Sequence, residues 1–509
     1  MNQQVPVKSI RSVITASSLG TMIEWYDFYI FGMLAKTIST QFFPEGNPTA
    51  ALLSTLAIFA AGFIVRPFGA LVFGRLGDLI GRKYTFLLTL VLMGGSTFLI
   101  GCVPSYSSIG IVAPILVLLL RLLQGLALGG EYGGAATYVA EHAPLHKRGY
   151  YTSWIQTTAT LGLFVALGVI LLVKSNMSDS SFNSEWGGWR YPFWISILLV
   201  GVSIYIRMKM AESPMFSKLK AEGKTSVNPL KESFRKKANF KMVLLALFGA
   251  VMGQGVVWYT GQFYAQSFLE NKCALEFEQS RTIMLWAIAF ATPFFLFFGW
   301  LSDKIGRKWI MMTGMLLAII SYRPIFSEFL KDTAIHNAQI SMAPGAPAVI
   351  TYLPVSNSTD SLKITTEKNL LHNGITLTRA TTDTLRSSGQ ISLSPVITYS
   401  GKHLPGNLYW KFIGLVFLLI LYVTMVYGPI AAFLVELFPT KIRYTSMSLP
   451  YHIGNGVFGG LVPFIGLLLT TSYPADPLVG LWYPIGVAAL CLIIGVLYLS
   501  NKIDRNIKD

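Results

Sequence analysis

The chain has 509 residues, of which 53% are hydrophobic and 13% are charged. Soluble domains carry roughly 25% charged residues, so this composition excludes an ordinary water-soluble protein. The net charge is +16, but Lys and Arg gather between apolar runs, which indicates membrane orientation and argues against a nucleic-acid partner. The three cysteines, Cys102, Cys273 and Cys491, are too scattered for a disulfide framework or a metal-ligand cluster.

Apolar runs of about 20 residues recur along the chain, the length that a helix needs to cross ~30 Å of hydrocarbon. Continuous apolar runs indicate helices, because the strands of a transmembrane barrel alternate apolar and polar residues. We expect the first run to be a retained helix and not a cleaved signal peptide. The sequence predicts twelve spans, at 13–36, 51–74, 84–104, 111–140, 150–173, 190–207, 242–266, 282–300, 309–328, 409–430, 445–468 and 478–500.

The charged residues between these spans predict the topology. With the N-terminus inside, the inner segments hold most of the Lys and Arg residues, and the short outer loops hold few, at Lys36, Lys174, Arg190, Lys272 and Arg281. Both termini are therefore expected in the cytoplasm. The basic stretch 209–241 is expected to be a cytoplasmic linker between a six-helix bundle at 1–208 and a second bundle at 242–509.

A long polar stretch, 327–408, separates the ninth and tenth spans. Long translocated segments are largely exempt from the charge rule, so we expect this stretch to be an extracytoplasmic insertion. Residues alternate in character at 348–354 and 374–378. This alternation indicates short strands, and hence a β-rich module.

Two motif pairs indicate that the halves are repeats. Gly-Arg-Leu-Gly-Asp-Leu-Ile-Gly-Arg-Lys at 74–83 recurs as Gly-Trp-Leu-Ser-Asp-Lys-Ile-Gly-Arg-Lys at 299–308. Glu-x-x-Pro-x-x-x-Arg at 141–148 recurs at 436–443. The second pair is separated by more residues than the first, so the extra length lies after Asp303, where the polar stretch falls. Internal duplication of this kind is typical of transporters.

The repeated Gly-x-x-x-Asp-x-x-Gly-Arg-Lys segment resembles the signature loop of the major facilitator superfamily. The segment Gly-Thr-Met-Ile-Glu-Trp-Tyr-Asp-Phe-Tyr-Ile-Phe-Gly at 20–32, with Arg-x-x-Gln-Gly-x-x-x-Gly-Gly-Glu-Tyr-Gly-Gly at 121–134, resembles the metabolite:proton symporter family. That family includes bacterial proline/betaine, α-ketoglutarate, citrate and shikimate transporters.

The resemblance implies an all-α major facilitator fold with 12 transmembrane helices in two six-helix bundles, placed in the bacterial inner membrane. It also implies an inter-helix charge network that gates alternating access without touching solute. The residues of that network are Asp78, Arg82, Asp303, Arg307, Glu141, Arg148, Glu436 and Arg443.

Ionisable side chains are costly at membrane depth, so the few within the spans are candidates for function. Glu24 and Asp27 lie three residues apart on one helix face. Their mutual repulsion and their burial favour proton binding by at least one of them, and Glu131 in the fourth span is a further proton-coupling candidate. Glu24 or Asp27 could instead be a permanently paired structural ion, and Glu131 could instead anchor a glycine-rich helix crossing.

Arg66 and Arg121 are membrane-depth cations. They could neutralise those carboxylates or hold a solute carboxylate in a guanidinium fork, and the sequence leaves both roles open. The other solute-binding candidates are Gln124, Tyr26, Tyr29, Gln254, Trp258, Tyr259 and Gln262. Their rings could bind a quaternary ammonium group or simply pack. The second half has almost no charge at depth, so we expect charge chemistry in the first half.

These features predict a secondary active transporter that takes up a small polar metabolite together with protons. The two arginines favour an organic acid such as a di- or tricarboxylate, although a zwitterionic osmolyte of the proline or betaine type would also fit. The same fold could also serve a solute sensor or an exporter, but the stretch 159–168 lacks the Gly-Pro signature of exporters. No enzyme motif, metal cluster or cofactor site is expected. The expected partners are the solute and the lipid bilayer, with the chain a monomer.

Overall fold

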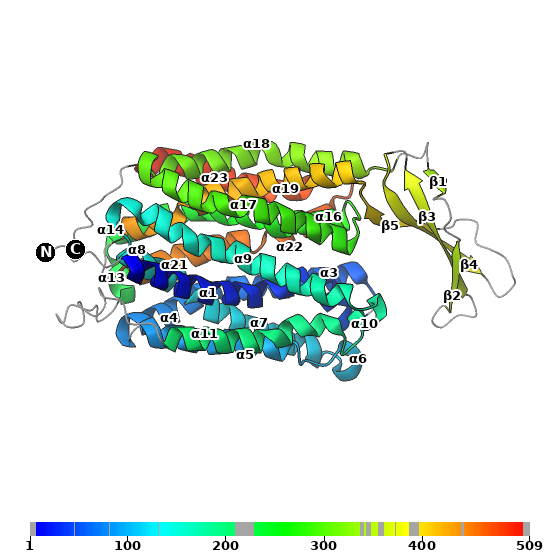
Figure 1. The fold of residues 1–509 in the computed structure, drawn as a ribbon, viewed down its shortest axis with the longest axis horizontal. Coiled ribbons are helices and arrows are strands. Elements are labelled where there is room, and N and C mark those ends of the chain that lie inside the picture. The colour runs from blue at the N-terminus through cyan, green and yellow to red at the C-terminus, as the bar shows by residue number, and fades with distance from the viewer. Residues whose placement is uncertain are drawn as a thin grey trace. The chain divides into compact units, whose positions relative to one another are not determined.

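The computed structural model describes residues 7–44, 46–80, 82–130, 132–208, 229–335, 340–342, 348–354, 361–371, 373–385, 396–438 and 442–501 (Figure 1). The chain forms two compact units. The first, here the helical unit, comprises Met1–Tyr264, Ile288–Tyr322 and Phe417–Asp509. The second, here the insertion unit, comprises Ala265–Ala287 and Arg323–Val416.

The first half of the helical unit contains α1 (Val7–Met33), α2 (Ala35–Phe42), α3 (Pro48–Ile64), α4 (Arg66–Ile80), α5 (Arg82–Ile100), α6 (Tyr106–Ile109), α7 (Val112–Gly129), α8 (Tyr132–His142), η1 (Leu145–Lys147), α9 (Arg148–Ser175), α10 (Asp179–Asn183), η2 (Gly188–Arg190) and α11 (Tyr191–Met208). The expected span 51–74 is interrupted at Val65. Pro67 follows directly in the first turn of α4, where a residue without a backbone N–H is tolerated, whereas it would break a helix interior.

The helices of the second half of the chain, counted over both units, are α13 (Pro229–Arg235), α14 (Lys237–Ala246), η3 (Leu247–Val251), α15 (Met252–Tyr259), η4 (Thr260–Tyr264), α16 (Ala265–Asn271), α17 (Phe277–Ile305), α18 (Lys308–Thr333), α19 (Gly406–Tyr427), α20 (Ile430–Leu437), α21 (Arg443–His452), η6 (Ile453–Gly459), α22 (Val462–Ser472), η7 (Val479–Leu481) and α23 (Trp482–Tyr498). The segments η3, η4 and η6 are π-helical. Such widened turns inside α-helices occur frequently at functional sites.

In the part of the chain that the structure describes, nine helical runs are long and apolar enough to cross a membrane, judged by length and composition. They coincide with nine of the expected spans, and α1, α5 and α11 occupy the other three. The predicted all-helical membrane fold is confirmed. Several helices extend beyond their apolar runs: α14 begins at Lys237 and α18 ends at Thr333, because helical hydrogen bonding continues into polar residues.

Helix packing in the helical unit depends on small residues. In the first half, α1 packs on α9 and α11, and α7 packs on α3, α4 and α5. A Cβ added at Gly125 would lie 1.9 Å from the carbonyl oxygen of Gly62, so α3 and α7 touch backbone to backbone. The two halves meet through α3 and α4 against α21 and η6. There, a Cβ at Gly456 would lie 2.6 Å from the carbonyl oxygen of Phe63.

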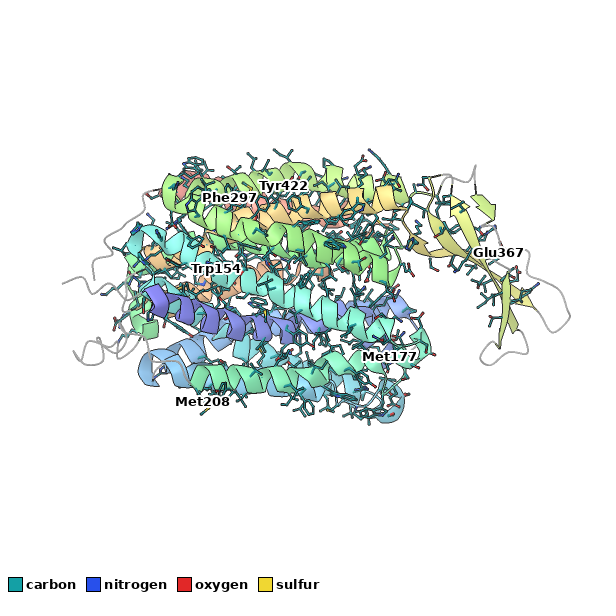
Figure 2. All side chains as sticks on the ribbon, in the orientation of Figure 1. Trp154, Met177, Met208, Phe297, Glu367 and Tyr422 are labelled. Carbon is teal, nitrogen blue, oxygen red and sulfur yellow. The ribbon has the colours of Figure 1, made fainter. Side chains whose placement is uncertain are left out.

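The two ends of the helical unit can be assigned from labelled residues. Met177 follows α9 and Met208 ends α11, and Figure 2 shows them at opposite ends of the bundle. The end at Met208 leads into the basic linker, so it is the end expected to face the cytoplasm.

The insertion unit contains an antiparallel sheet of five described strands: β1 (Ile340–Met342), β2 (Val349–Pro354), β3 (Ser361–Leu371), β4 (Thr376–Leu385) and β5 (Val396–His403). Both β1 and β2 pair with the same side of β3, and β4 and β5 follow. The prediction of a β-rich module is confirmed. Strand β2 falls on the piece expected at 348–354, whereas β4 runs beyond the piece expected at 374–378, because β3 and β4 form a ten-residue hairpin ladder.

The sheet is joined to the helices of its own unit by main-chain bonds. The N–H of Lys402 donates to the carbonyl of Ala274 (2.9 Å), and the N–H of Glu276 donates to the carbonyl of Lys402 (2.9 Å). The Nζ atom of Lys402 donates to the carbonyl of Thr333 at the end of α18 (2.7 Å). The amide of Gln279 in α17 bonds both the N–H (2.7 Å) and the carbonyl (2.9 Å) of Leu404.

Candidate functional site

The two membrane-depth arginines of the first half lie on one aromatic ring. Arg66 is the first residue of α4 and Arg121 lies in the middle of α7, and their exposed fractions are 1% and 0%. The guanidinium carbons lie 4.4 Å and 3.9 Å from the centroid of Phe28 in α1. Cation–π attraction is strengthened by desolvation, so Phe28 holds both guanidinium groups in place.

These guanidinium groups have hydrogen-bonding capacity left over. Nη1 of Arg121 donates to Oε1 of Gln124 (2.6 Å), but within the described residues Nε and Nη2 of both arginines have no hydrogen-bond partner. No carboxylate in the described part of the chain forms an ion pair with either arginine. A buried cation without a counter-ion is unfavourable. The arrangement is therefore suited to receive an anion.

Asp27 is a buried carboxylate of α1, with an exposed fraction of 1%. Within the described part of the chain, neither carboxylate oxygen of Asp27 has a hydrogen-bond partner. Its backbone carbonyl accepts a hydrogen bond from Nε2 of Gln124 (3.3 Å), which also donates to the hydroxyl of Thr97 (2.6 Å). Of the other two proton-coupling candidates, the side chain of Glu24 and the whole of Glu131 lie outside the described residues.

Aromatic residues from both halves meet beside Arg66. Trp25 and Tyr29 of α1 each lie 5.8 Å, between ring centroids, from Trp258 of α15, and Tyr29 lies 5.5 Å from Phe263 of η4. The Cζ atom of Arg66 lies 5.6 Å from the Trp25 ring. These contacts place Trp258 and Phe263 of the seventh expected span against α1.

Several polar atoms in this aromatic region are buried without a partner among the described residues: the hydroxyl of Tyr29, Nε1 of Trp258 and both amide atoms of Gln262. The ring of Tyr259 packs on Phe63, 5.0 Å between centroids. Unsatisfied buried polar atoms are rare in stable structures and call for an explanation. A polar solute would satisfy them.

Two predicted solute ligands have their polar groups engaged elsewhere. The amide of Gln254 forms a reciprocal pair with the amide of Asn455 (2.9 and 3.1 Å). The hydroxyl of Tyr26 donates to the carbonyl of Pro192 in α11 (2.8 Å). In this arrangement both residues join helices, and neither offers a free polar group to solute.

The second half supplies a buried titratable group that the sequence analysis did not single out. His452, the last residue of α21, has an exposed fraction of 2%. Its neighbour Tyr451 stacks on Tyr132 of α8 with ring centroids 3.5 Å apart, and shares a hydroxyl hydrogen bond with Tyr427 (2.8 Å). The sequence analysis looked for charged residues within the spans and counted histidine as neutral, so it missed His452. The polar stretch Tyr-His-Ile-Gly-Asn-Gly within an apolar span was the available signal.

The predicted gating residues of the second half do come together at the end of the bundle where α9 begins. Asp303 accepts hydrogen bonds from the N–H groups of Gly149 (2.9 Å) and Tyr150 (2.8 Å), in the first turn of α9. Arg307 pairs with Asp303 (2.7 Å) and grips Glu436 with two nitrogens (3.0 and 3.3 Å). A carboxylate at a helix N-terminus is stabilised by the helix dipole.

The remaining predicted gating residues are only partly described. Arg443 pairs with Glu141 (3.6 Å). Arg148 is the first residue of α9, directly before the two N–H groups that donate to Asp303. The side chains of Asp78 and Arg82 lie outside the described residues. The second-half copy of the repeated loop is thus a bridge between α9, α17 and α20.

The fold has two similar bundles, with buried cations that have no carboxylate partner among the described residues and with a charged bridge at one end. These features are those of a membrane transporter. Residues 13–247 match the family described as "Sugar (and other) transporter". The chain is 32% identical over 496 residues to the inner membrane metabolite transport protein YhjE of Escherichia coli K12, covering 96% of this chain and 94% of the relative. The chain therefore belongs to the sugar and metabolite transporter family of the major facilitator superfamily. It is a multi-pass inner-membrane transporter and not an enzyme.

Other relatives carry more specific names. The α-ketoglutarate permease of Escherichia coli K12 is 37% identical over 320 residues, which is 63% of this chain and 72% of the permease. The proline/betaine transporter of the same organism is 34% identical over 332 residues, which is 62% of this chain and 64% of the transporter. The proton:xylose symporter XylE, solved with 6-bromo-6-deoxy-D-glucose, has a TM-score of 0.65 at 16% identity, covering 97% of this chain and 95% of that one. This last likeness shows the fold.

Proposed function

We propose that this metabolite transporter is a proton-coupled symporter that takes up a small organic acid, such as a di- or tricarboxylate, by alternating access. The observation that carries the proposal is the pair of guanidinium groups on Phe28, buried and without a carboxylate partner among the described residues. Guanidinium binds carboxylate in a two-pronged geometry. The α-ketoglutarate permease among the relatives supports the same class of solute.

The coupling proton is assigned to a buried carboxyl group of α1. Asp27 is buried beside Gln124, and Gln124 also contacts Arg121. A carboxyl group at this depth that binds and releases a proton would change the charge of the site by one unit. That change can alter which face of the bilayer the site opens to, because each state of the transporter holds charge at a different cost.

The test is uptake of radiolabelled α-ketoglutarate into proteoliposomes under an imposed pH gradient. The wild type is expected to accumulate label, Arg66→Gln and Arg121→Gln are expected to lose it, and Asp27→Asn is expected to lose the part driven by the gradient. Arg235→Gln, on the exposed face of α13, is the matched control. Wild-type accumulation that ignores the pH gradient would remove proton coupling, and full gradient-driven uptake by Asp27→Asn would remove Asp27 from it.

A zwitterionic osmolyte is the second candidate, favoured by the ring cluster of Trp25, Tyr29 and Trp258. Aromatic faces attract quaternary ammonium groups, and betaine carries such a group together with a carboxylate. A thermal-shift series with organic acids, betaine and proline distinguishes an organic-acid transporter from an osmolyte transporter. A ligand that binds the folded state raises the melting temperature, and the rise grows with the logarithm of ligand concentration above Kd. A shift with betaine and none with any organic acid would replace the first proposal by the second.

A further inference from the structure

His452 is the buried titratable group that the proposed function does not use. Its exposed fraction is 2%, and among the described residues neither ring nitrogen has a hydrogen-bond partner. The ring lies edge-to-face on Tyr451, 5.2 Å between centroids. A buried imidazole with two unsatisfied nitrogens is unfavourable unless the site is filled in some state of the protein.

Arg66 of α4, from the opposite half of the protein, lies beside this part of the chain. Helix α4 packs against α21, and a Cβ added at Gly456, four residues after His452, would lie 3.8 Å from the Cβ of Arg66. Helices α4, α8, α13, α14 and α20 and segments η3 and η6 pack against α21. The other titratable groups described on these elements pair or stack with further residues or are at least partly exposed, as His142 is in the last turn of α8. Tyr132 of α8 stacks on Tyr451, and Glu141 pairs with Arg443 at the other end of α21. Glu436 of α20 pairs with Arg307. Glu232 of α13 is half-exposed, and the exposed groups are Arg75, Lys231, Arg235, Lys237 and Lys241.

We propose that His452 is the group whose protonation is linked to binding of the solute carboxylate at Arg66. The proposal deepens the proposed function and rests on it. Arg66 has no carboxylate partner among the described residues. A protonated His452 beside it therefore places two positive charges in a medium of low dielectric constant, where like charges repel strongly. A carboxylate at Arg66 cancels one of those charges. The anion then favours the proton on His452, and the proton favours the anion.

The linkage is reciprocal, because each ligand must change the affinity of the other by the same factor. It gives the transporter a way to load an anion and a proton as a pair. Asp27 is not bonded to either arginine, since neither of its carboxylate oxygens has a hydrogen-bond partner among the described residues. Asp27 stays the candidate for the conformational step, and His452 is assigned to the coupling of the two binding events.

The experiment is isothermal titration calorimetry of α-ketoglutarate into the purified full-length protein, in buffers of different ionisation enthalpy. The dependence of the observed heat on the buffer gives the number of protons taken up per solute bound. The wild type is expected to take up protons, and its Kd is expected to weaken by up to about tenfold per pH unit as pH rises through the titration of one linked group. His452→Gln is expected to bind with a Kd that does not change with pH and to take up no proton from this group.

His146→Gln is the matched control, because His146 is an exposed histidine of the loop before α9. It should take up as many protons as the wild type. Binding without proton uptake by the wild type, or undiminished uptake in His452→Gln, overturns the inference and leaves the organic-acid proposal intact. No binding of α-ketoglutarate or any other organic acid overturns both.

A variant at a buried position such as His452 can fail to fold, so Asp27→Asn provides a second test of the proposal. If His452 is the linked group, Asp27→Asn still takes up protons when the anion binds, even though it has lost transport driven by the pH gradient. Loss of proton uptake in Asp27→Asn would assign the linkage to the carboxyl group and overturn the proposal.

Discussion

Replacing Asp303 by Asn tests the charged bridge between α9 and α17. The carboxylate of Asp303 accepts from two N–H groups of the first turn of α9 and from Arg307, at 2.7 to 2.9 Å. Asn keeps one accepting oxygen, but its NH2 group would face a donor in place of the other. The variant also loses its negative charge beside a helix N-terminus and a guanidinium group.

The size of the effect follows from these contacts. A hydrogen bond to a charged group contributes roughly 1.5–3 kcal/mol, and a charge at a helix N-terminus contributes about 0.3–1 kcal/mol more. Loss of one such bond and of the charge therefore costs about 2–4 kcal/mol in the closed arrangement of this end. Each 1.4 kcal/mol is about a tenfold change in an equilibrium. The population open at this end should rise by about thirty- to several-hundredfold, up to saturation.

Ser153 provides the readout, because it lies where the two helices touch. A Cβ added at Gly299 would lie 2.4 Å from the Ser153 hydroxyl, so a cysteine at 153 is shielded while this end is closed. The assay is the rate at which a membrane-impermeant maleimide labels Ser153→Cys in inverted vesicles. Asp303→Asn should raise that rate at least tenfold, and Asp383→Asn in β4 is the control. An unchanged labelling rate would refute the assignment of Asp303 to closing this end.

Two further predictions concern packing and thiol chemistry. Gly125→Ala should lower the melting temperature of the purified protein strongly, because its Cβ would lie 1.9 Å from a carbonyl oxygen of α3. Gly168→Ala should be neutral or slightly stabilising, because a Cβ at Gly168 would meet nothing within 4 Å. Equal melting temperatures of the two variants would contradict the packing argument. Burial raises the pKa of the Cys273 thiol to about 12, so at pH 8 only about one part in ten thousand is thiolate, the reactive form. At that pH, mass spectrometry should find that iodoacetamide leaves Cys273 unmodified in the folded protein and modifies it after denaturation, with the half-buried Cys102 as the internal comparison. Rapid modification of Cys273 in the folded protein would show that the loop between α16 and α17 opens.

The sequence was most informative where chemistry and repetition coincide. The duplicated loop and the Glu-x-x-Pro-x-x-x-Arg blocks predicted a shared charge network, and Asp303, Arg307 and Glu436 do meet. Repetition of a motif at matched positions carries information about three-dimensional placement, because two similar bundles place equivalent loops at the same end. Apolar length likewise predicted the helices, since hydrocarbon thickness sets the length of a span.

The sequence was least informative about which way side chains point within a span. Gln254 and Tyr26 were expected to face solute, but their polar groups bond Asn455 and the carbonyl of Pro192. The π-helical segments η3, η4 and η6 are one reason. Each widened turn shifts the face on which later residues lie, so a 3.6-residue period does not carry across it. The break at Val65 has the same effect on Arg66, whose place on Phe28 could not be derived from spacing.

The bonds that hold Lys402 and Leu404 set a practical limit on shortening the insertion. Strand β5 is joined at its last residues to the loop between α16 and α17 and to the end of α18, through Ala274, Gln279 and Thr333. A deletion that reconnects the chain upstream of residue 400 would keep these junctions. One that removes 402–404 would strip hydrogen-bond partners from three helix ends at once. The last residues of β5 are thus the part of the insertion to leave untouched.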